Sequence, residues 1–177
     1  MLRIRGIILT MLAGVFFTAQ SCAAQQCNNA IPSHTPESRF SVQTDGTVLD
    51  QRTHLVWMRC SVGQHWSQDK NTCMGNAQPL TWSQAQQSAN QYSMDNGWRL
   101  PTVHELSAIV ELRCFNPAID LGVFPQTAPT HFWSATPFSN KSGHYWLIQF
   151  LNGENHTDSE KRLAFVRLVK TASANPR

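Results

Sequence analysis

The stretch "GWRLPTVHELSAIVELRC", residues 97–114, decides how this chain of 177 residues folds. Pro101 disfavours helical geometry at the residue before it, so the three residues that precede the proline are expected to be extended. Thr102 and Glu105 have the spacing of a capping box, in which two side chains close the start of a helix. We therefore predict a short strand that turns directly into a capped helix. This structural motif comprises Trp98, Arg99, Leu100, Pro101, Thr102 and Glu105.

The predicted helix has one apolar face, formed by Val103, Leu106, Ile109 and Val110, and this face should be buried. Arg99, just before the helix, is either a cation that binds a ligand or a structural donor. A guanidinium group carries several N–H donors on a long apolar stem, so it can satisfy backbone carbonyls at a bend while the stem packs among aromatics. We favour the structural role.

An earlier helix is expected to begin at Thr81. Thr81 and Gln84 again have capping-box spacing, and Gly97 is suited to the left-handed conformation that ends many helices. Apolar residues follow the cap at helical spacing and should form one stripe. The stripe comprises Trp82, Ala85, Ala89 and Tyr92.

Strands are expected on both sides of these helices. Asp45-Gly46 lies inside "RFSVQTDGTVLD" and indicates a hairpin, because glycine accepts the positive φ of such turns, and "HLVWMRC" should be the next strand. Residues 61–79 are polar and are expected to be irregular. After a proline-rich loop, "HFWSAT", "HYWLIQFLNGEN" and "LAFVRLVK" should form sheet, with a turn at Asn152-Gly153 and an exposed polar loop up to Arg162.

The first residues predict export. Arg3 and Arg5 precede the apolar run "GIILTMLAGVFF", and small residues follow in "SCAAQQ", which is the pattern of a secretory signal peptide. Cleavage after Ala24 would leave Gln25 first, whereas the alternative is a lipidated Cys22, the one route to a membrane that we expect. The expected layout is a signal peptide over 1–24, a polar N-terminal tail over 25–38 held only by Cys27, one domain over 39–171 and a C-terminal tail over 172–177.

The charge of the mature chain argues against a nucleic-acid partner. Removing Arg3 and Arg5 from the 14 basic residues leaves 12 against 11 acidic residues, a net charge of +1. Such a chain has no broad electrostatic attraction for nucleic acid or anionic lipid. About 150 mature residues suit one domain with a real core, for which 6 Trp and 9 Phe provide large side chains.

Four cysteines remain once Cys22 is removed or lipidated, and an even number in an exported chain indicates two disulfides. Three connectivities are possible. We favour Cys60–Cys73, which closes a polar loop, and Cys27–Cys114, which ties the tail to the domain. A zinc site is the rival, but the sequence has no CxxC or HxxxH spacing, so neither a metal nor another cofactor is expected.

Six segments, taken in order, carry a resemblance to a known family. They are "GTVLDQRTHLVWMRC", "TWSQAQQSA", "GWRLPTVHEL", "FWSAT", "YWLIQFLNGE" and "VRLVK", of which "GWRLPT…EL" is the most specific. Over residues 40–170 the chain resembles the family named for the C-terminal domain of the Legionella collagen-like adhesin. The resemblance implies an α+β, C-type lectin-like fold, in which two helices flank a twisted, mainly antiparallel sheet and the terminal strands meet.

The same resemblance implies binding and supplies no catalytic residues. The best-understood adhesin domain of the family recognises sulfated glycosaminoglycans through basic surface and forms a trimer below a collagen-like stalk. The present chain has no Gly-X-Y repeat to drive trimerisation, and its mature charge is near zero. These departures argue against heparin-type binding and leave the oligomeric state open, because a shared fold does not transfer a ligand.

Other chemistries find little support in the sequence. The triplet over residues 78–80 is the nearest match to a calcium-binding triplet of C-type lectins, but it lacks the last oxygen ligand. Ser107 and Ser134 have no nucleophile-elbow context. The formylglycine-generating oxidases share a distant architecture and use a reactive cysteine pair late in the chain, whereas the last cysteine here is Cys114. We therefore predict no catalytic residues and no metal site.

A binding surface on loops is the remaining option, because aromatic and basic side chains there can stack on or hydrogen-bond a partner. The candidate residues are Trp66, Lys70, Lys141, His144, His156, Lys161 and Arg162. Taken singly, each is more often an ordinary solvated residue. We expect an exported, periplasmic or secreted, adhesin-like binding module that is not an enzyme, with an envelope or extracellular glycan or protein as its partner. The alternative is a structural subunit of an envelope or surface-appendage assembly, and a secreted enzyme ranks third.

Overall fold

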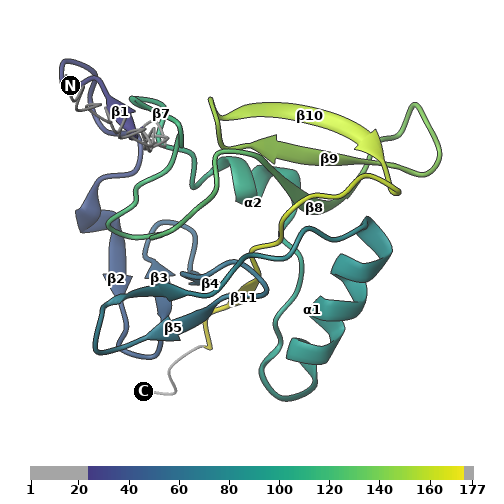
Figure 1. The fold of residues 1–177 in the computed structure, drawn as a ribbon, viewed down its shortest axis with the longest axis horizontal. Coiled ribbons are helices and arrows are strands. Elements are labelled where there is room, and N and C mark those ends of the chain that lie inside the picture. Colours follow the sequence, from purple (N-terminus) through teal and green to yellow (C-terminus); the bar gives the residue numbers. More distant parts are fainter. Residues whose placement is uncertain (1–23, 174–177) are drawn as a thin grey trace, which may run out of the picture.

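The computed structural model describes residues 24–173, which form two α-helices and several small antiparallel sheets (Figure 1). The expected signal peptide with Cys22 and the last residues of the expected C-terminal tail lie outside the described residues. Within residues 24–173, no helix is long and apolar enough to cross a membrane.

One sheet has four antiparallel strands in the order β11-β4-β3-β2. The predicted hairpin is confirmed, because β2 pairs with β3 across a turn in which Gly46 has a φ of 83°. Val48 and Trp57 are partners in the register of β3 and β4 and are both fully buried, so one face of this sheet packs on the core. The strands are β2 (Phe40–Val42), β3 (Thr47–Asp50), β4 (Leu55–Met58) and β11 (Val169–Thr171).

A second sheet has three antiparallel strands in the order β10-β9-β8. The strands are β8 (His131–Pro137), β9 (His144–Gln149) and β10 (Glu154–Ser159). The prediction of an exposed loop up to Arg162 is wrong, because most of this polar stretch is β10, which pairs with β9 along its whole length. Strand β10 lies at the edge of the sheet and has no buried residues, so its sequence lacks the apolar alternation that indicates a strand.

The last predicted strand, "LAFVRLVK", is regular only at its end, in β11. Before β11, Ala164 and Phe165 make isolated bridges with Leu80 and Phe132. These residues therefore cross between the two larger sheets and belong fully to neither.

Helix α1 (Trp82–Asn96) begins with the predicted capping box at Thr81. It ends at Gly97, whose φ of 70° is left-handed, as predicted. Ala85 and Ala89 of the predicted stripe are buried, whereas Tyr92 is 42% exposed. The end of the helix thus presents an aromatic ring to solvent.

Helix α2 (Val103–Ser107) also begins with its predicted capping box, formed by Thr102 and Glu105. It is shorter than the apolar pattern predicts. The backbone N–H groups of Ile109 and Val110 bond carbonyls three residues earlier, which tightens the chain out of the α-helix. Both residues are nevertheless buried, so the predicted apolar face is confirmed although the helix ends early.

The segment between the two helices joins the larger sheets. The backbone of Arg99 bonds that of Val169 in both directions, at 2.9 and 3.0 Å, which ties the segment to β11. The Pro101 carbonyl accepts a bond of 2.7 Å from the Ala135 N–H on β8. Trp98, the residue before Arg99, is also buried. The extended geometry predicted before the proline is therefore confirmed, and its role is to connect β11 to β8.

Arg99 has a different partner from the one expected. Its guanidinium donates to both carboxylate oxygens of Glu105, at 2.7 and 2.8 Å, and to a single carbonyl, that of Leu100, at 3.2 Å. Its side chain is 42% exposed. Arg99 therefore holds Glu105 of the α2 capping box in place and does not satisfy several carbonyls in the interior.

Two other arginines bond several buried acceptors. Arg59 donates to the carbonyls of residues 122 and 123, at 2.9 and 2.8 Å, which fastens the proline-rich loop to the end of β4. Arg167 is fully buried and donates to the Thr127 hydroxyl at 2.7 Å and to two carbonyls at the end of β4. Burial, with a smaller effect from the charge of Arg59, lowers the pKa of Arg167 to about 9. Arg167 therefore remains a cation at neutral pH.

Two hydrophobic clusters lie on the two faces of the three-stranded sheet. One contains Phe132 and Ile148 with residues of the four-stranded sheet and α2. The other contains Trp133 and Leu147 with the buried alanines of α1. Successive residues of a strand point to opposite faces, so both faces of β8 and β9 are covered, as the apolar runs predict.

Residues 61–79 contain a hairpin where an irregular segment was expected. Strand β5 (His65–Ser67) pairs with β6 (Thr72–Met74), and Trp66 lies opposite Cys73. The structure joins the same cysteines that the sequence favours, in the disulfides Cys60–Cys73 and Cys27–Cys114. Disulfides of this kind indicate folding in an oxidising compartment.

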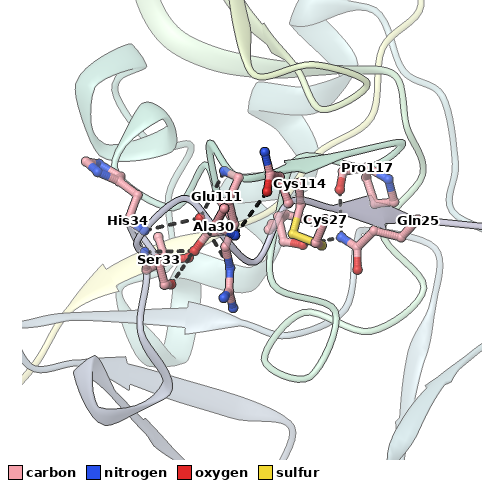
Figure 2. A network of polar contacts seen from close by, with 12 residues as sticks. Gln25, Cys27, Ala30, Ser33, His34, Glu111, Cys114 and Pro117 are labelled. Carbon is pink, nitrogen blue, oxygen red and sulfur yellow. Dashed lines mark hydrogen bonds and ion pairs between the residues drawn. A yellow bond between two sulfur atoms is a disulfide. The ribbon is translucent and has the colours of Figure 1, made fainter.

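The N-terminal tail is held by far more than Cys27, which corrects the prediction. Strand β1 (Gln26–Cys27) pairs with β7 (Cys114–Phe115) beside the disulfide. The amide of Gln25 donates to two carbonyls, and the buried carboxylate of Glu111 accepts bonds from residues 33–35 (Figure 2). A 3-10 helix, Glu37–Arg39, then leads into β2. These contacts require partners distant in sequence, so the local composition could not reveal them.

Candidate functional site

A pocket of about 530 Å³ opens between the β2–β3 turn, the segment that follows β4, the β5–β6 hairpin, the end of α1 and β11. This volume lies within the ~300–1,000 Å³ of small-ligand sites. The lining residues that carry aromatic or polar side chains are Asp45, Thr47, Ser61, Gln64, His65, Trp66, Gln91, Tyr92, Trp98 and Lys170.

Trp66 is held rigidly in the wall of the pocket. Its Nε1 donates to the Thr44 carbonyl at 3.1 Å, and the guanidinium of Arg59 lies 4.2 Å from the centroid of its ring. The β2–β3 turn packs directly on Trp66, because a Cβ added at Gly46 would lie 2.5 Å from the Trp66 Cβ. The hairpin glycine therefore serves two purposes here, the positive φ and the close approach to an aromatic side chain.

Two more aromatic residues line the pocket. Tyr92 comes from the end of α1, and Trp98 follows the glycine that ends this helix. The Lys170 ammonium lies 4.7 Å from the centroid of the Trp98 ring, within the range of a cation–π interaction. The end of α1 and the segment that follows it thus add two aromatic side chains to the lining, and the last strand adds Lys170.

Polar groups also line the pocket. Ser61 is only 2% exposed, and its hydroxyl has no hydrogen-bond partner among the described residues. The side-chain Oε1 of Gln64 accepts from the Ser61 N–H at 3.1 Å. Asp45 accepts from the N–H and the hydroxyl of Thr47, at 2.9 and 2.7 Å. The pocket therefore combines flat apolar surface with hydrogen-bonding groups, and its lining carries one carboxylate and one ammonium.

The structure divides the predicted binding surface between two regions. Trp66 lines the pocket, and Lys70 is exposed on the β5–β6 turn without lining it. The other five predicted residues belong to the three-stranded sheet or its connections, on the opposite side of the molecule from β5 (Figure 1). They are Lys141, His144, His156, Lys161 and Arg162. These predicted residues therefore do not form a single surface.

Part of that second group forms a polar cluster on the three-stranded sheet. Arg162 forms an ion pair with Asp158, and its Nη2 lies 3.0 Å from the Nδ1 of His131. The rings of His131 and His156 meet edge to face with centroids 5.0 Å apart. Burial, then the charges of Arg162 and His156, lower the pKa of His131, and only Asp158 acts in the opposite direction.

We predict that acidification destabilises the fold through His131. Its pKa is lowered in the folded state, so its contribution to stability is complete above the ordinary value of about 6.5 and is lost as the pH falls through the lower folded value. Thermal unfolding between pH 7.5 and pH 5 should show a decline in Tm that is smaller in His131→Gln. His104→Gln, at an exposed position of α2, is the control and should keep the full decline. An identical decline in the wild type and His131→Gln would contradict the assignment.

Most of the pocket was missed by sequence reasoning. Ser61, Tyr92 and Lys170 are distant in sequence and carry no motif, and Tyr92 fits the buried stripe of α1 equally well. The sequence indicates Asp45 only as a residue of the hairpin turn. The available signal was indirect, namely that the pocket residues flank a hairpin turn, a helix end and a disulfide. Only the packing of these elements brings the side chains together.

The same structure gives no indication of a metal centre. Within residues 24–173, no group of three or more His, Cys, Asp and Glu side chains is placed to hold a metal ion.

These features define a small disulfide-linked α+β module with a mixed aromatic and polar pocket. Residues 46–170 match the model of the Lcl C-terminal domain, and the chain belongs to this family. The match begins and ends at residues that line the pocket, Gly46 and Lys170. No curated protein matches the chain. The family indicates an adhesin-associated module and specifies no ligand.

Proposed function

We propose that this chain is an exported, non-catalytic binding module, periplasmic or secreted, whose pocket receives an envelope or extracellular glycan or protein. The observation that carries the proposal is the convergence of Trp66, Tyr92 and Trp98 around a concave, partly polar site. Tyrosine and tryptophan provide large contact area together with a polar group, which makes them frequent at binding sites. The family match and the disulfides support export and adhesion. A C-type lectin-like arrangement of the helices and sheets is part of the proposal.

The side chains of the pocket suit binding better than nucleophilic catalysis. Ser61 is the one hydroxyl that is buried in the lining, and among the described residues nothing accepts its proton. A catalytic serine requires a hydrogen bond to a base that activates it. Binding, by contrast, needs only groups that complement a ligand in position.

The alternative is a structural subunit of an envelope or appendage assembly. It has one observation in its favour, the edge strand β10, whose outer side has no neighbouring strand in residues 24–173. Such an edge can pair with a strand of another protein. Its charged and polar residues also suit an edge that stays free of partners, so we place this function second.

A retention experiment separates the two functions. The oxidised chain is immobilised and exposed to envelope and extracellular fractions of the producing cells. Tyr92→Ala with Gln91→Ala, which removes two pocket side chains, should reduce retention about tenfold or more. The matched control is Met94→Ala with Gln87→Ala, at exposed positions of the same helix that do not line the pocket. Retention that survives the pocket variant and is lost in Asn155→Lys on β10 would establish the structural function instead.

A further inference from the structure

We propose that the pocket binds an uncharged saccharide. One sugar ring stacks on the aromatic residues, and its hydroxyls bond to Ser61 and to the side-chain amides of Gln64 and Gln91. This inference rests on the proposed function and specifies its ligand class. It follows from the unpartnered hydroxyl of Ser61, the aromatic lining and the balance of charge in the pocket.

The aromatic residues supply apolar surface of limited extent. Tyr92 is partly exposed, and Trp66 is fixed by its bond to Thr44 and by the guanidinium of Arg59. A ring that is already fixed loses little entropy when a ligand packs on it. A pyranose has C–H groups on a flat face and hydroxyls at its rim, so it matches an aromatic ring bordered by polar groups.

Ser61 gives the strongest indication of a ligand. A hydroxyl that is buried without a partner costs free energy, and such groups are uncommon in folded proteins. The residue is 2% exposed, its Oγ is unpartnered among the described residues, and it lines the pocket. Gln64 does not relieve it, because its side-chain oxygen accepts from the Ser61 N–H and not from the Ser61 hydroxyl. A hydroxyl of a sugar, which both donates and accepts, would satisfy it.

The charges of the pocket favour an uncharged ligand. Asp45 is the carboxylate of the lining and Lys170 its ammonium, and their charges are of opposite sign. Lys170 lies over Trp98, and Arg59 uses its N–H groups on the carbonyls of residues 122 and 123. A sulfated or phosphorylated ligand needs a cluster of free cations, and the lining has no such cluster.

The test uses the oxidised mature chain and calorimetric titration with defined disaccharides. The uncharged probes are cellobiose, maltose, lactose and diacetylchitobiose, and the anionic probe is a sulfated heparin disaccharide. At least one uncharged probe should bind with a roughly millimolar Kd, as expected of a small ligand with few contacts. This Kd should change less than about twofold between 50 and 500 mM NaCl, because no ion pair is involved.

Two variants connect that binding to the pocket. Ser61→Ala should weaken it about threefold to tenfold, while its Tm stays equal or rises by a few degrees, because an unsatisfied buried hydroxyl is removed. Tyr92→Ala should weaken binding by a similar factor. The matched controls are Ser67→Ala on β5 and Met94→Ala on α1, neither of which lines the pocket. A purely structural Ser61 would lose stability and keep its affinity.

The outcomes distinguish this inference from the proposed function. Weaker binding in either pocket variant, with both controls unchanged, supports the inference. Unchanged affinity in both pocket variants overturns it. Preference for the sulfated disaccharide overturns the claim that the ligand is uncharged and leaves the proposed binding function intact. The same conclusion follows if no disaccharide binds while the pocket still retains envelope material. If the pocket variants also leave that retention unaffected, both proposals fail.

Discussion

Replacing Asp50 by alanine is expected to lower the free energy of unfolding by about 3–5 kcal/mol, because it leaves the buried Arg39 without its counter-charge. The two side chains are 0% and 5% exposed. Arg39 Nε donates to one carboxylate oxygen of Asp50 at 2.7 Å, and Nη2 donates to the other. Burial acts to raise the pKa of Asp50, but the bonds from Arg39 and Thr53 outweigh it, so the pKa is lowered. Asp50 is therefore a carboxylate at neutral pH.

A second ion pair of the chain provides the control for this variant. Asp158 and Arg162 have the same chemistry at the surface, where their side chains are 36% and 38% exposed. Asp158→Ala should cost about 1 kcal/mol or less, because solvent screens an exposed pair. Urea unfolding of both variants measures the difference. Equal losses in the two variants would show that burial of the Arg39–Asp50 pair does not matter as claimed.

Replacing Glu111 by glutamine is expected to cost about 3 kcal/mol at neutral pH and to loosen residues 33–35 of the N-terminal tail. Glu111 is 1% exposed, and its carboxylate accepts bonds from Ser33, His34 and Thr35 (Figure 2). Burial acts to raise its pKa, but the bonds from Ser33 and Thr35 outweigh it and lower the pKa from 4.5 to about 2. Removal of the charge should therefore weaken every contact that holds residues 33–35.

The stabilisation by Glu111 is expected to depend on pH. The folded pKa of Glu111 lies below the unfolded value, so the stabilisation is complete above about pH 4.5 and is lost as the pH falls towards 2. The wild type should lose about 3 kcal/mol more than Glu111→Gln between pH 5 and pH 2. Glu37→Gln, exposed in the same N-terminal segment, should behave as the wild type. Limited proteolysis should cut residues 28–38 faster in Glu111→Gln alone, and equal cleavage of all three proteins would contradict this role.

Local signals in the sequence predicted the parts of the fold that are determined locally. Both capping boxes, the glycine exit of α1 and the Asp45-Gly46 hairpin depend on residues within one or two turns of each other, and all are present. The proline of the "GWRLPT" motif likewise constrains only its neighbour. The family resemblance added the order of these elements, and residues 46–170 match that family.

The remaining features depend on contacts between residues far apart in the sequence. Strand β10 is polar because it lies at an edge, and its strand conformation comes from pairing with β9. Arg59 and Arg167 bond carbonyls on segments distant in sequence, which no spacing rule reveals. The pocket is a further case, because Ser61 and Tyr92 line the same pocket although they lie far apart in the sequence.

The central claim, that partners bind in this pocket, is tested most directly by the indole N–H signals of the protein in a proton–nitrogen NMR spectrum. The chain has 6 tryptophans, of which Trp66 and Trp98 line the pocket and Trp57 and Trp133 are fully buried elsewhere. During titration with the envelope or extracellular fraction that the chain retains, we expect the signals of Trp66 and Trp98 to shift while those of Trp57 and Trp133 stay fixed. Saturable binding that leaves Trp66 and Trp98 unmoved would contradict the account.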